Sequence, residues 1–230
     1  MASLIVFQRR LLVLSHFHKT IFVHIPKCGG QSIEDIYIRE TGLTWKNRAP
    51  LLLRKRADGE SAPPRLAHLT IKEYLENKYV SNEMFDSYFK FSVIRNPYTR
   101  VVSFYKYMGF SDKISINEFC QEYLVKFNSK KHAKYWFYMP QVNFLLMRDG
   151  RVGIDKLLRL ENLQEDWERS VLSLTNVVTS KVPHVNISKE SDESTRRTDY
   201  LRELNKKSFE VINRLYDKDF LFFNYERRLY

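Results

Sequence analysis

The segment Lys19-Thr-Ile-Phe-Val-His-Ile-Pro-Lys-Cys-Gly-Gly-Gln-Ser32 contains the pattern that decides the fold. Its first part, Lys19–Ile25, is rich in β-branched and aromatic residues. Pro26 and a pair of glycines follow, and this order predicts a short strand that ends in a tight turn. Apolar residues then recur at helical spacing over Gln31–Glu40, which predicts a helix. The segment therefore predicts a strand, a tight loop and a helix in succession.

The rest of the chain continues this alternation. Two further strands are predicted over Phe89–Ile94 and Ile154–Leu160. Helices are predicted from Thr70 with Glu73 in capping-box spacing, over Tyr98–Met108, from Ser115 with Glu118, over Tyr135–Met147 around Pro140, over about 162–174 and over about 200–216. Strands that alternate with helices are typical of an α/β domain with a mainly parallel central sheet flanked by helices.

Length and composition favour one globular domain over residues 1–230. The chain has 230 residues, of which 43% are hydrophobic and 28% charged, so extensive disorder is excluded. Its two cysteines, Cys28 and Cys120, are too few for a disulfide scaffold or a cysteine-rich zinc domain. Residues 50–65 have the composition of a loop, which we expect to be exposed and mobile.

The charge balance points to an anionic partner. Thirty-eight Lys and Arg against 27 Asp and Glu give a net charge of +11, which favours a nucleotide, a nucleic acid, an acidic glycan or a membrane surface as the partner. The apolar N-terminal run is interrupted by Gln8, Arg9 and Arg10, well short of the roughly 18 apolar residues that a membrane span needs. We expect a soluble, cytoplasmic protein.

The loop between the first strand and its helix has the composition of a phosphate-binding site. Gly29 and Gly30 let backbone N–H groups approach an anion, Lys27 supplies a full positive charge, and the Ser32 hydroxyl can donate a hydrogen bond. Lys27 precedes the glycines, whereas a Walker A loop places its lysine after them, and the chain contains no Walker A match. An ordinary P-loop kinase or ATPase is therefore disfavoured.

A second anion-binding segment follows the second strand. Arg95 stands at the predicted carboxyl end of that strand, where open α/β sheets bind ligands. Its guanidinium suits a bidentate phosphate contact. Ser103, farther along the next helix, can add a hydroxyl to the same anion. We therefore expect two separate phosphate sites.

These motifs resemble those of carbohydrate sulfotransferases of the heparan-sulfate 2-O-sulfotransferase-like type (sulfotransferase family 2). The loop His24–Ser32 resembles their 5′-phosphosulfate loop, and Val93–Pro97 with Ser103 resembles their 3′-phosphate segment. Further matches follow in order at Pro140-Gln141, Arg159–Asn162, Pro183–Asn186 with Ser188, Asp219-Phe220 and Asn224-Tyr225.

The resemblance implies a P-loop-like, three-layer fold and a specific reaction. The donor would be 3′-phosphoadenosine 5′-phosphosulfate (PAPS), and the acceptor a hydroxyl on a glycan or glycoconjugate, with no metal required. Lys27 would stabilise charge on the leaving phosphate, and Arg95 with Ser103 would hold the 3′-phosphate. The donor-binding residues would be Lys27, Cys28, Gly29, Gly30, Gln31, Ser32, Arg95 and Ser103.

The expected general base is His68. It stands directly before the Thr70-capped helix, between the two nucleotide motifs, in the segment where similar enzymes carry their base. We expect His24 to face the sheet or to support the loop, and a metal site at His16 and His18 is disfavoured because no further ligands have suitable spacing. The position of Cys28 in the loop predicts a stabilised, oxidation-sensitive thiolate.

Two other classes of function remain open at this stage. The net charge and the basic clusters around Lys130 and at Arg196-Arg197 would suit a nucleic-acid-binding protein, although no known binding motif is present. A nucleotide kinase would require Mg²⁺ and ATP.

Overall fold

The computed structural model describes residues 14–60, 62, 64–183 and 200–229. Its centre is a four-stranded sheet in the order β1-β2-β3-β4. β1 (Leu14–Ser15) pairs antiparallel with β2 (Thr20–Val23), whereas β2, β3 (Phe89–Ile94) and β4 (Lys156–Arg159) are parallel to one another. The sequence-based prediction of an α/β fold with a mainly parallel sheet is therefore confirmed.

Short helices connect and flank these strands. They are α1 (Gly30–Glu40), α2 (Ile71–Glu76), α3 (Asn82–Ser87), α4 (Pro97–Tyr107), α5 (Ile116–Glu118), α6 (Val125–Phe127), α7 (Tyr135–Tyr138), α8 (Leu163–Asp166), α10 (Lys206–Leu215) and α11 (Asp217–Phe223). Wider π-helical turns at Phe119–Leu124 and Trp167–Leu172 extend α5 and α8. Single 3₁₀ turns occur at Ala49–Leu51, Leu66–His68, Gln141–Phe144 and Leu160–Asn162.

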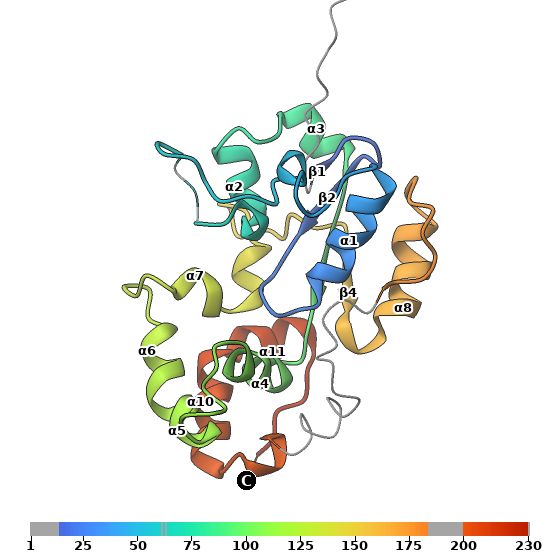
Figure 1. Cartoon of the computed structure of the whole chain (residues 1–230). Coiled ribbons are helices and arrows are strands. Elements are labelled where there is room, and N and C mark those ends of the chain that lie inside the picture. Colours follow the sequence, from blue (N-terminus) through green and yellow to red (C-terminus); the bar gives the residue numbers. More distant parts are fainter. Residues whose placement is uncertain (1–13, 61, 63, 184–199, 230) are drawn as a thin grey trace, which may run out of the picture.

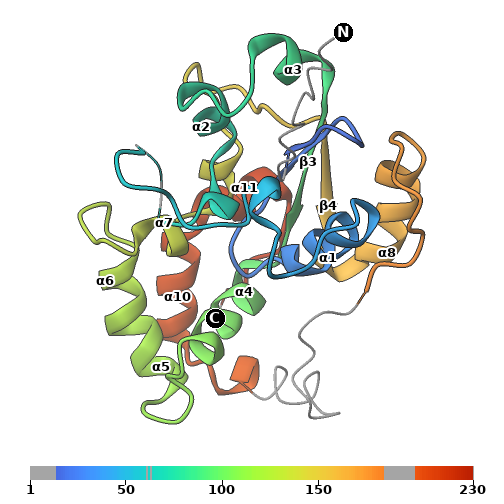
Figure 2. The ribbon, with the colours of Figure 1, turned by 45° about the horizontal axis from the view of Figure 1, so that its top comes forward.

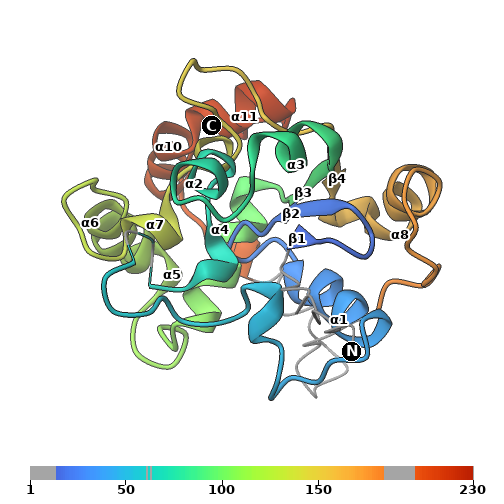
Figure 3. The same ribbon diagram turned by 90° about the horizontal axis from the view of Figure 1, so that it is seen from above.

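The helices form a layer on each side of the sheet. α1 and α8 lie on one side and α2 and α7 on the other, as Figures 1 and 3 show. Below the carboxyl end of β3, α4 gathers with α10 and α11, and α5 and α6 lie beside α10 (Figures 1 and 2). This is the three-layer, P-loop-like arrangement that the resemblance to sulfotransferases implies. It brings the carboxyl ends of β2, β3 and β4 to one edge of the sheet.

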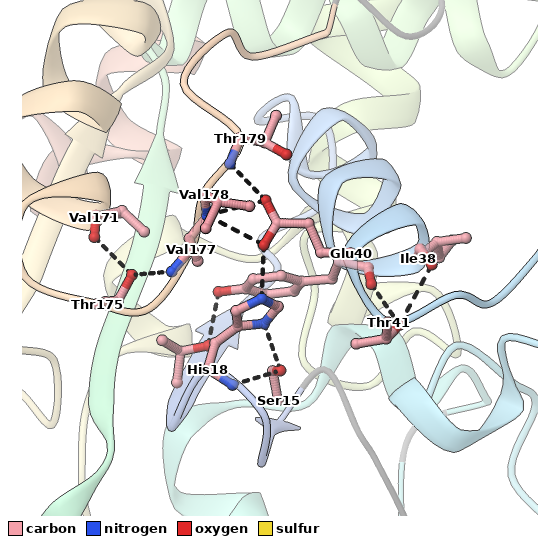
Figure 4. A network of polar contacts seen from close by, with 12 residues as sticks. Ser15, His18, Ile38, Glu40, Thr41, Val171, Thr175, Val177, Val178 and Thr179 are labelled. Atoms are coloured by element: carbon pink, nitrogen blue, oxygen red, sulfur yellow. Dashed lines mark hydrogen bonds and ion pairs between the residues drawn. The ribbon is translucent and has the colours of Figure 1, made fainter.

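A buried polar network fastens β1 and β2 to the end of α1 (Figure 4). His18 contacts the Ser15 hydroxyl through Nδ1 at 2.6 Å and the Glu40 carboxylate through Nε2 at 2.8 Å. Glu40 also accepts hydrogen bonds from the backbone N–H groups of Val178 and Thr179. Because these partners occupy both ring nitrogens, His18 serves here as a structural cross-link.

Several predicted elements need correction. The helix predicted over about 200–216 is interrupted at Leu204, and α10 begins after Asn205, whose side chain accepts a hydrogen bond from the Ser208 N–H. The helix predicted over Tyr135–Met147 is divided, because Pro140 cannot continue α7.

The loop predicted over residues 50–65 is not exposed throughout. Leu51, Leu52 and Leu53 at its start are buried in the hydrophobic core. The part that follows forms an isolated bridge between Lys55 and Arg65. The helix starts predicted at Thr70 and Ser115 are confirmed, the first with its complete capping box.

Candidate functional site

The loop after β2 makes one tight turn and then leads directly into the first turn of α1. The Cys28 N–H donates to the Ile25 carbonyl at 3.3 Å, and the Ser32 N–H donates to the Gly29 carbonyl at 3.1 Å. Lys27 and Gly29 both have positive φ, at 66° and 82°. α1 starts at Gly30 without a side-chain cap. Its first N–H groups and its dipole therefore face the loop, an arrangement that favours a bound anion.

Both glycines of the loop are required by what lies beside them. A Cβ on Gly29 would meet Leu160 Cδ1 at 2.5 Å, and the positive φ of Gly29 already disfavours any other residue. A Cβ on Gly30 would meet His24 Cδ2 at 2.2 Å. The His24 ring is held in that place by Glu34, whose carboxylate lies 2.5 Å from Nδ1. His24 therefore supports the loop, which is one of the two roles that the sequence left open.

Arg95, directly after β3, contacts the loop. Its Nη1 donates to the Lys27 carbonyl at 3.1 Å, and its Nε donates to Thr99 Oγ1 at 2.9 Å. The side chain is largely buried between these partners. The two segments that the sequence predicts to bind phosphate at separate sites therefore adjoin each other.

One face of α4 contacts both Arg95 and Lys27. Thr99, Ser103 and Tyr107 follow one another at four-residue spacing and so share that face. Arg95 is bonded to the first of them, and the Lys27 ammonium lies 3.9 Å from the ring centroid of the last. Ser103 occupies the middle position of this face, between the contact residues of Arg95 and Lys27.

His68 lies at the end of a 3₁₀ turn on the other side of the loop. Its Nδ1 lies 3.0 Å from the backbone carbonyl oxygen of His24, and because a carbonyl only accepts, Nδ1 carries the proton. The ring lies between His24 and Trp136, with centroid distances of 4.5 and 5.7 Å. Burial lowers the pKa of His68 well below its usual range, and the electrostatic influence of His24 acts in the same direction. The neutral ring therefore presents an unprotonated Nε2.

A cavity of about 670 Å³ opens beside His68. Its wall combines aromatic, cationic and apolar side chains, namely His68, Thr70, Lys72, Glu73, Lys130, Tyr135, Trp136, Met139, Asn143, Leu146, Met147 and Arg148. Glu73 is occupied by the cap of α2, and Arg148 is paired with Glu76. Lys72 and Lys130 add further positive charge to the wall, and Trp136 offers it an aromatic surface.

Behind the loop lies a buried polar network that sequence reasoning did not assign. The Gln141 side chain accepts from the Arg95 N–H at 2.9 Å and donates to the Arg95 carbonyl at 2.8 Å. Asp219 accepts from the N–H groups of Gln141 and Val142 at 2.8 and 3.0 Å. Burial raises the pKa of Asp219, and the positive charge of Arg100 opposes that shift. The motifs Pro140-Gln141 and Asp219-Phe220 were the available sequence signals.

The thiolate predicted at Cys28 is wrong. The side chain turns into the core, is 1% exposed, and its Sγ–H donates to Gln141 Oε1 at 3.1 Å. Burial raises the pKa of this thiol to about 12, although Arg100 and Arg95 act in the opposite direction. The helix N-terminus and the charge of Lys27 do not offset the rise in the thiol pKa that burial causes.

Some predicted features lie outside the described residues. These are the match at residues 184–188, which includes His184 and Ser188, and the basic pair Arg196-Arg197. Within the described ranges, no group of three or more His, Cys, Asp or Glu side chains is placed to hold a metal ion. No helix in those ranges combines the length and apolarity that crossing a membrane requires.

The fold and this site define an α/β protein with a glycine-containing loop and a following arginine at the carboxyl ends of its parallel strands. The chain belongs to the sulfotransferase family, whose pattern it matches over residues 10–226. Neither a curated protein nor a solved structure matches the chain. Membership of the family supports a transferase that catalyses sulfotransfer.

Proposed function

We propose that this protein transfers the sulfuryl group of PAPS to a carbohydrate hydroxyl, with His68 as the general base. The observation that carries the proposal is the hydrogen bond from His68 Nδ1 to the His24 carbonyl. That bond leaves Nε2 as the basic nitrogen. Its acceptor, the His24 carbonyl, lies three residues before Lys27 in the chain. A base with a lowered pKa is unprotonated at neutral pH and can take the proton of an attacking hydroxyl.

The donor-binding residues follow from the loop and α4. The N–H groups at the start of α1, with Ser32 and Lys27, would hold the 5′-phosphosulfate. Arg95 and Ser103 would hold the 3′-phosphate that separates this donor from ATP. The fit is supported by the absence of a side-chain cap on α1 and by the close packing against both glycines, which keeps the loop free of side-chain bulk.

The reaction is an in-line displacement at sulfur. His68 Nε2 takes the proton of the acceptor hydroxyl while its oxygen forms the new bond to sulfur. The bond between sulfur and the bridging oxygen breaks, and its electron pair remains on the 5′-phosphate. Lys27 and the loop N–H groups stabilise the charge that develops there. The products are a sulfate ester and 3′-phosphoadenosine 5′-phosphate.

The cavity beside His68 supports a carbohydrate acceptor. Trp136 and Tyr135 present aromatic rings of the kind against which sugar rings stack, and Lys72 and Lys130 supply positive charge on the same wall. The chain as a whole carries +11, which would draw an acidic glycan to the cavity. Cys28 turns toward Gln141, so we propose that it shapes the loop from behind.

A transfer assay tests the proposal. The full chain is incubated with PAPS labelled in its sulfuryl group and with de-O-sulfated heparin, chondroitin, dermatan or a non-carbohydrate phenol. We expect label on a polysaccharide and none on the phenol. Absence of transfer to every carbohydrate, with transfer to the phenol, would contradict the acceptor class.

The matched variant for the base is His68→Asn. An asparagine side chain can still donate a hydrogen bond to the His24 carbonyl but has no basic nitrogen. We expect kcat to fall by roughly 10²- to 10⁴-fold, with the affinity for 3′-phosphoadenosine 5′-phosphate unchanged within about threefold. A variant that keeps its kcat would exclude His68 as the base.

A further inference from the structure

Buried polar groups join two parts of the molecule: the loop between β2 and α1 (His24–Ser32), here called the donor loop, and the wall of the cavity beside His68. Arg100, on α4 and 1% exposed, donates from Nε to the Pro26 carbonyl and from Nη1 to the Met139 carbonyl, both at 3.0 Å. Pro26 precedes Lys27 in the loop, and Met139 lines the cavity. One guanidinium therefore bridges the two proposed binding sites.

Gln141 makes a second connection between the same two parts. Its Oε1 accepts from the Cys28 thiol at 3.1 Å and from the Arg95 N–H at 2.9 Å. Gln141 is fully buried and lies two residues beyond Met139, in the turn that also carries the cavity residue Asn143. The loop is thus tied to residues 139–143 at two points, through Pro26 and through Cys28.

Asp219, on α11, holds the turn that carries Gln141. It accepts the backbone N–H groups of Gln141 and Val142 and lies 3.3 Å from Gln141 Nε2. Each polar atom of the Gln141 side chain therefore has a buried partner, and such satisfied networks in a low-dielectric interior are rigid. A displacement of the loop has to move Gln141 or break these bonds.

We propose that Arg100 and Gln141 are positioning residues that couple the donor loop to the cavity wall, so that donor binding stiffens the wall. The inference rests on the proposed donor site. It gives the two residues a specific task, because sulfuryl transfer requires the acceptor oxygen and the donor sulfur to be held at a fixed separation, and a misplacement of about 1 Å can cost about 10²-fold in rate.

Hydrogen–deuterium exchange of the full chain, with and without 3′-phosphoadenosine 5′-phosphate, tests the proposal without the need for an acceptor. The loop is followed through the amides of Cys28 and Ser32, and the segment that carries the wall residues Met139 and Asn143 is followed through the amides of Gln141, Val142 and Leu145, all of which are hydrogen-bonded. In the wild-type chain, we expect the ligand to slow exchange at both places by about threefold or more.

The decisive variant is Arg100→Lys. A lysine keeps the charge but lacks the planar fork that reaches two carbonyls. We expect the ligand still to slow exchange in the loop, while its effect on residues 139–145 disappears. Val102→Ala is the matched control, because Val102 is buried on the same helix and contacts neither carbonyl through a polar group. In that control both effects should persist.

If Arg100→Lys does not fold, Cys28→Ala provides the second variant, since it removes the thiol contact and leaves the bonds between Gln141 and Arg95. A reduced effect on residues 139–145 is expected there too. The inference is overturned, and the proposed donor is not, if the ligand slows amide exchange only in the loop of the wild-type chain. The same holds if the effect of the ligand on residues 139–145 is unchanged in the variants. No slowing anywhere in the wild type would contradict the proposed donor, and the inference with it.

Discussion

Replacement of Gly30 by alanine tests the packing on which the loop depends. The new Cβ would lie 2.2 Å from His24 Cδ2 and 2.4 Å from Nε2, so the imidazole has to move. Its ring is confined by Phe22 and His68, at centroid distances of 5.7 and 4.5 Å. The ring can therefore leave only by breaking the hydrogen bond to Glu34.

The expected cost combines three effects. Overpacking costs about 1–3 kcal/mol, and the loss of a buried hydrogen bond to a charged group costs about 1.5–3 kcal/mol. Alanine is intrinsically better than glycine in a helix by up to about 1 kcal/mol, which offsets part of the loss at Gly30. We expect Gly30→Ala to lower the free energy of unfolding by about 1.5–6 kcal/mol.

Urea denaturation of four proteins measures this effect: the wild type, Gly30→Ala, His24→Ala and the double variant. Once the His24 ring is removed, the alanine at position 30 has space. It should then change the free energy of unfolding by less than about 1 kcal/mol, in the stabilising direction. An equal cost of Gly30→Ala with and without the His24 ring would refute the packing argument.

Three further results follow from the site. The acidic limb of kcat/KM against pH, which reports groups of the free enzyme, should lie below about pH 6.5, because the lowered pKa of His68 keeps the base unprotonated until the solution is more acidic than its usual range; a limb above that value would contradict the neutral His68. Iodoacetamide at about pH 8 should not modify Cys28 in the folded chain, since burial raises its pKa to about 12; mass spectrometry that finds rapid modification there would show an exposed thiolate. Gly29→Ala should weaken binding of 3′-phosphoadenosine 5′-phosphate by about tenfold or more, because its Cβ would meet Leu160 in a backbone conformation with positive φ; calorimetry that finds unchanged affinity would contradict this.

The elements that the sequence predicted best are those set by local signals. β3 has the predicted bounds, and the complete capping box at Thr70 and Glu73 was readable from the spacing of the two residues. The strand, tight loop and helix that end in α1 follow from β-branched residues, two glycines and apolar spacing. Each of these signals acts over a few residues, so no knowledge of distant contacts was needed.

The features that the sequence did not predict depend on distant partners. The break before α10 follows from Asn205, whose N–H donates to Asn117 while its side chain caps Ser208. Gln141 and Asp219 meet across 78 residues of sequence. The acidity predicted for Cys28 failed because the loop composition does not reveal that the thiol turns into the core.

The sequence predicted those residues of the site that local signals mark, but not the contacts between distant segments. Lys27, the glycines and Arg95 were recognisable because each follows the carboxyl end of a strand. Direct contact between Arg95 and the Lys27 carbonyl could not be read from their spacing. The cavity beside His68 is likewise assembled from segments that are far apart in the chain.

The measurement that tests the central claim most directly is a calorimetric titration of the full chain with 3′-phosphoadenosine 5′-phosphate, with ADP and with ATP, without added metal. We expect binding of the first in the micromolar range, at about 1–10 μM, and a loss of at least about tenfold for ADP and ATP, which lack the 3′-phosphate that Arg95 and Ser103 are proposed to hold. Equal affinity for all three nucleotides would contradict the assignment of PAPS as the donor.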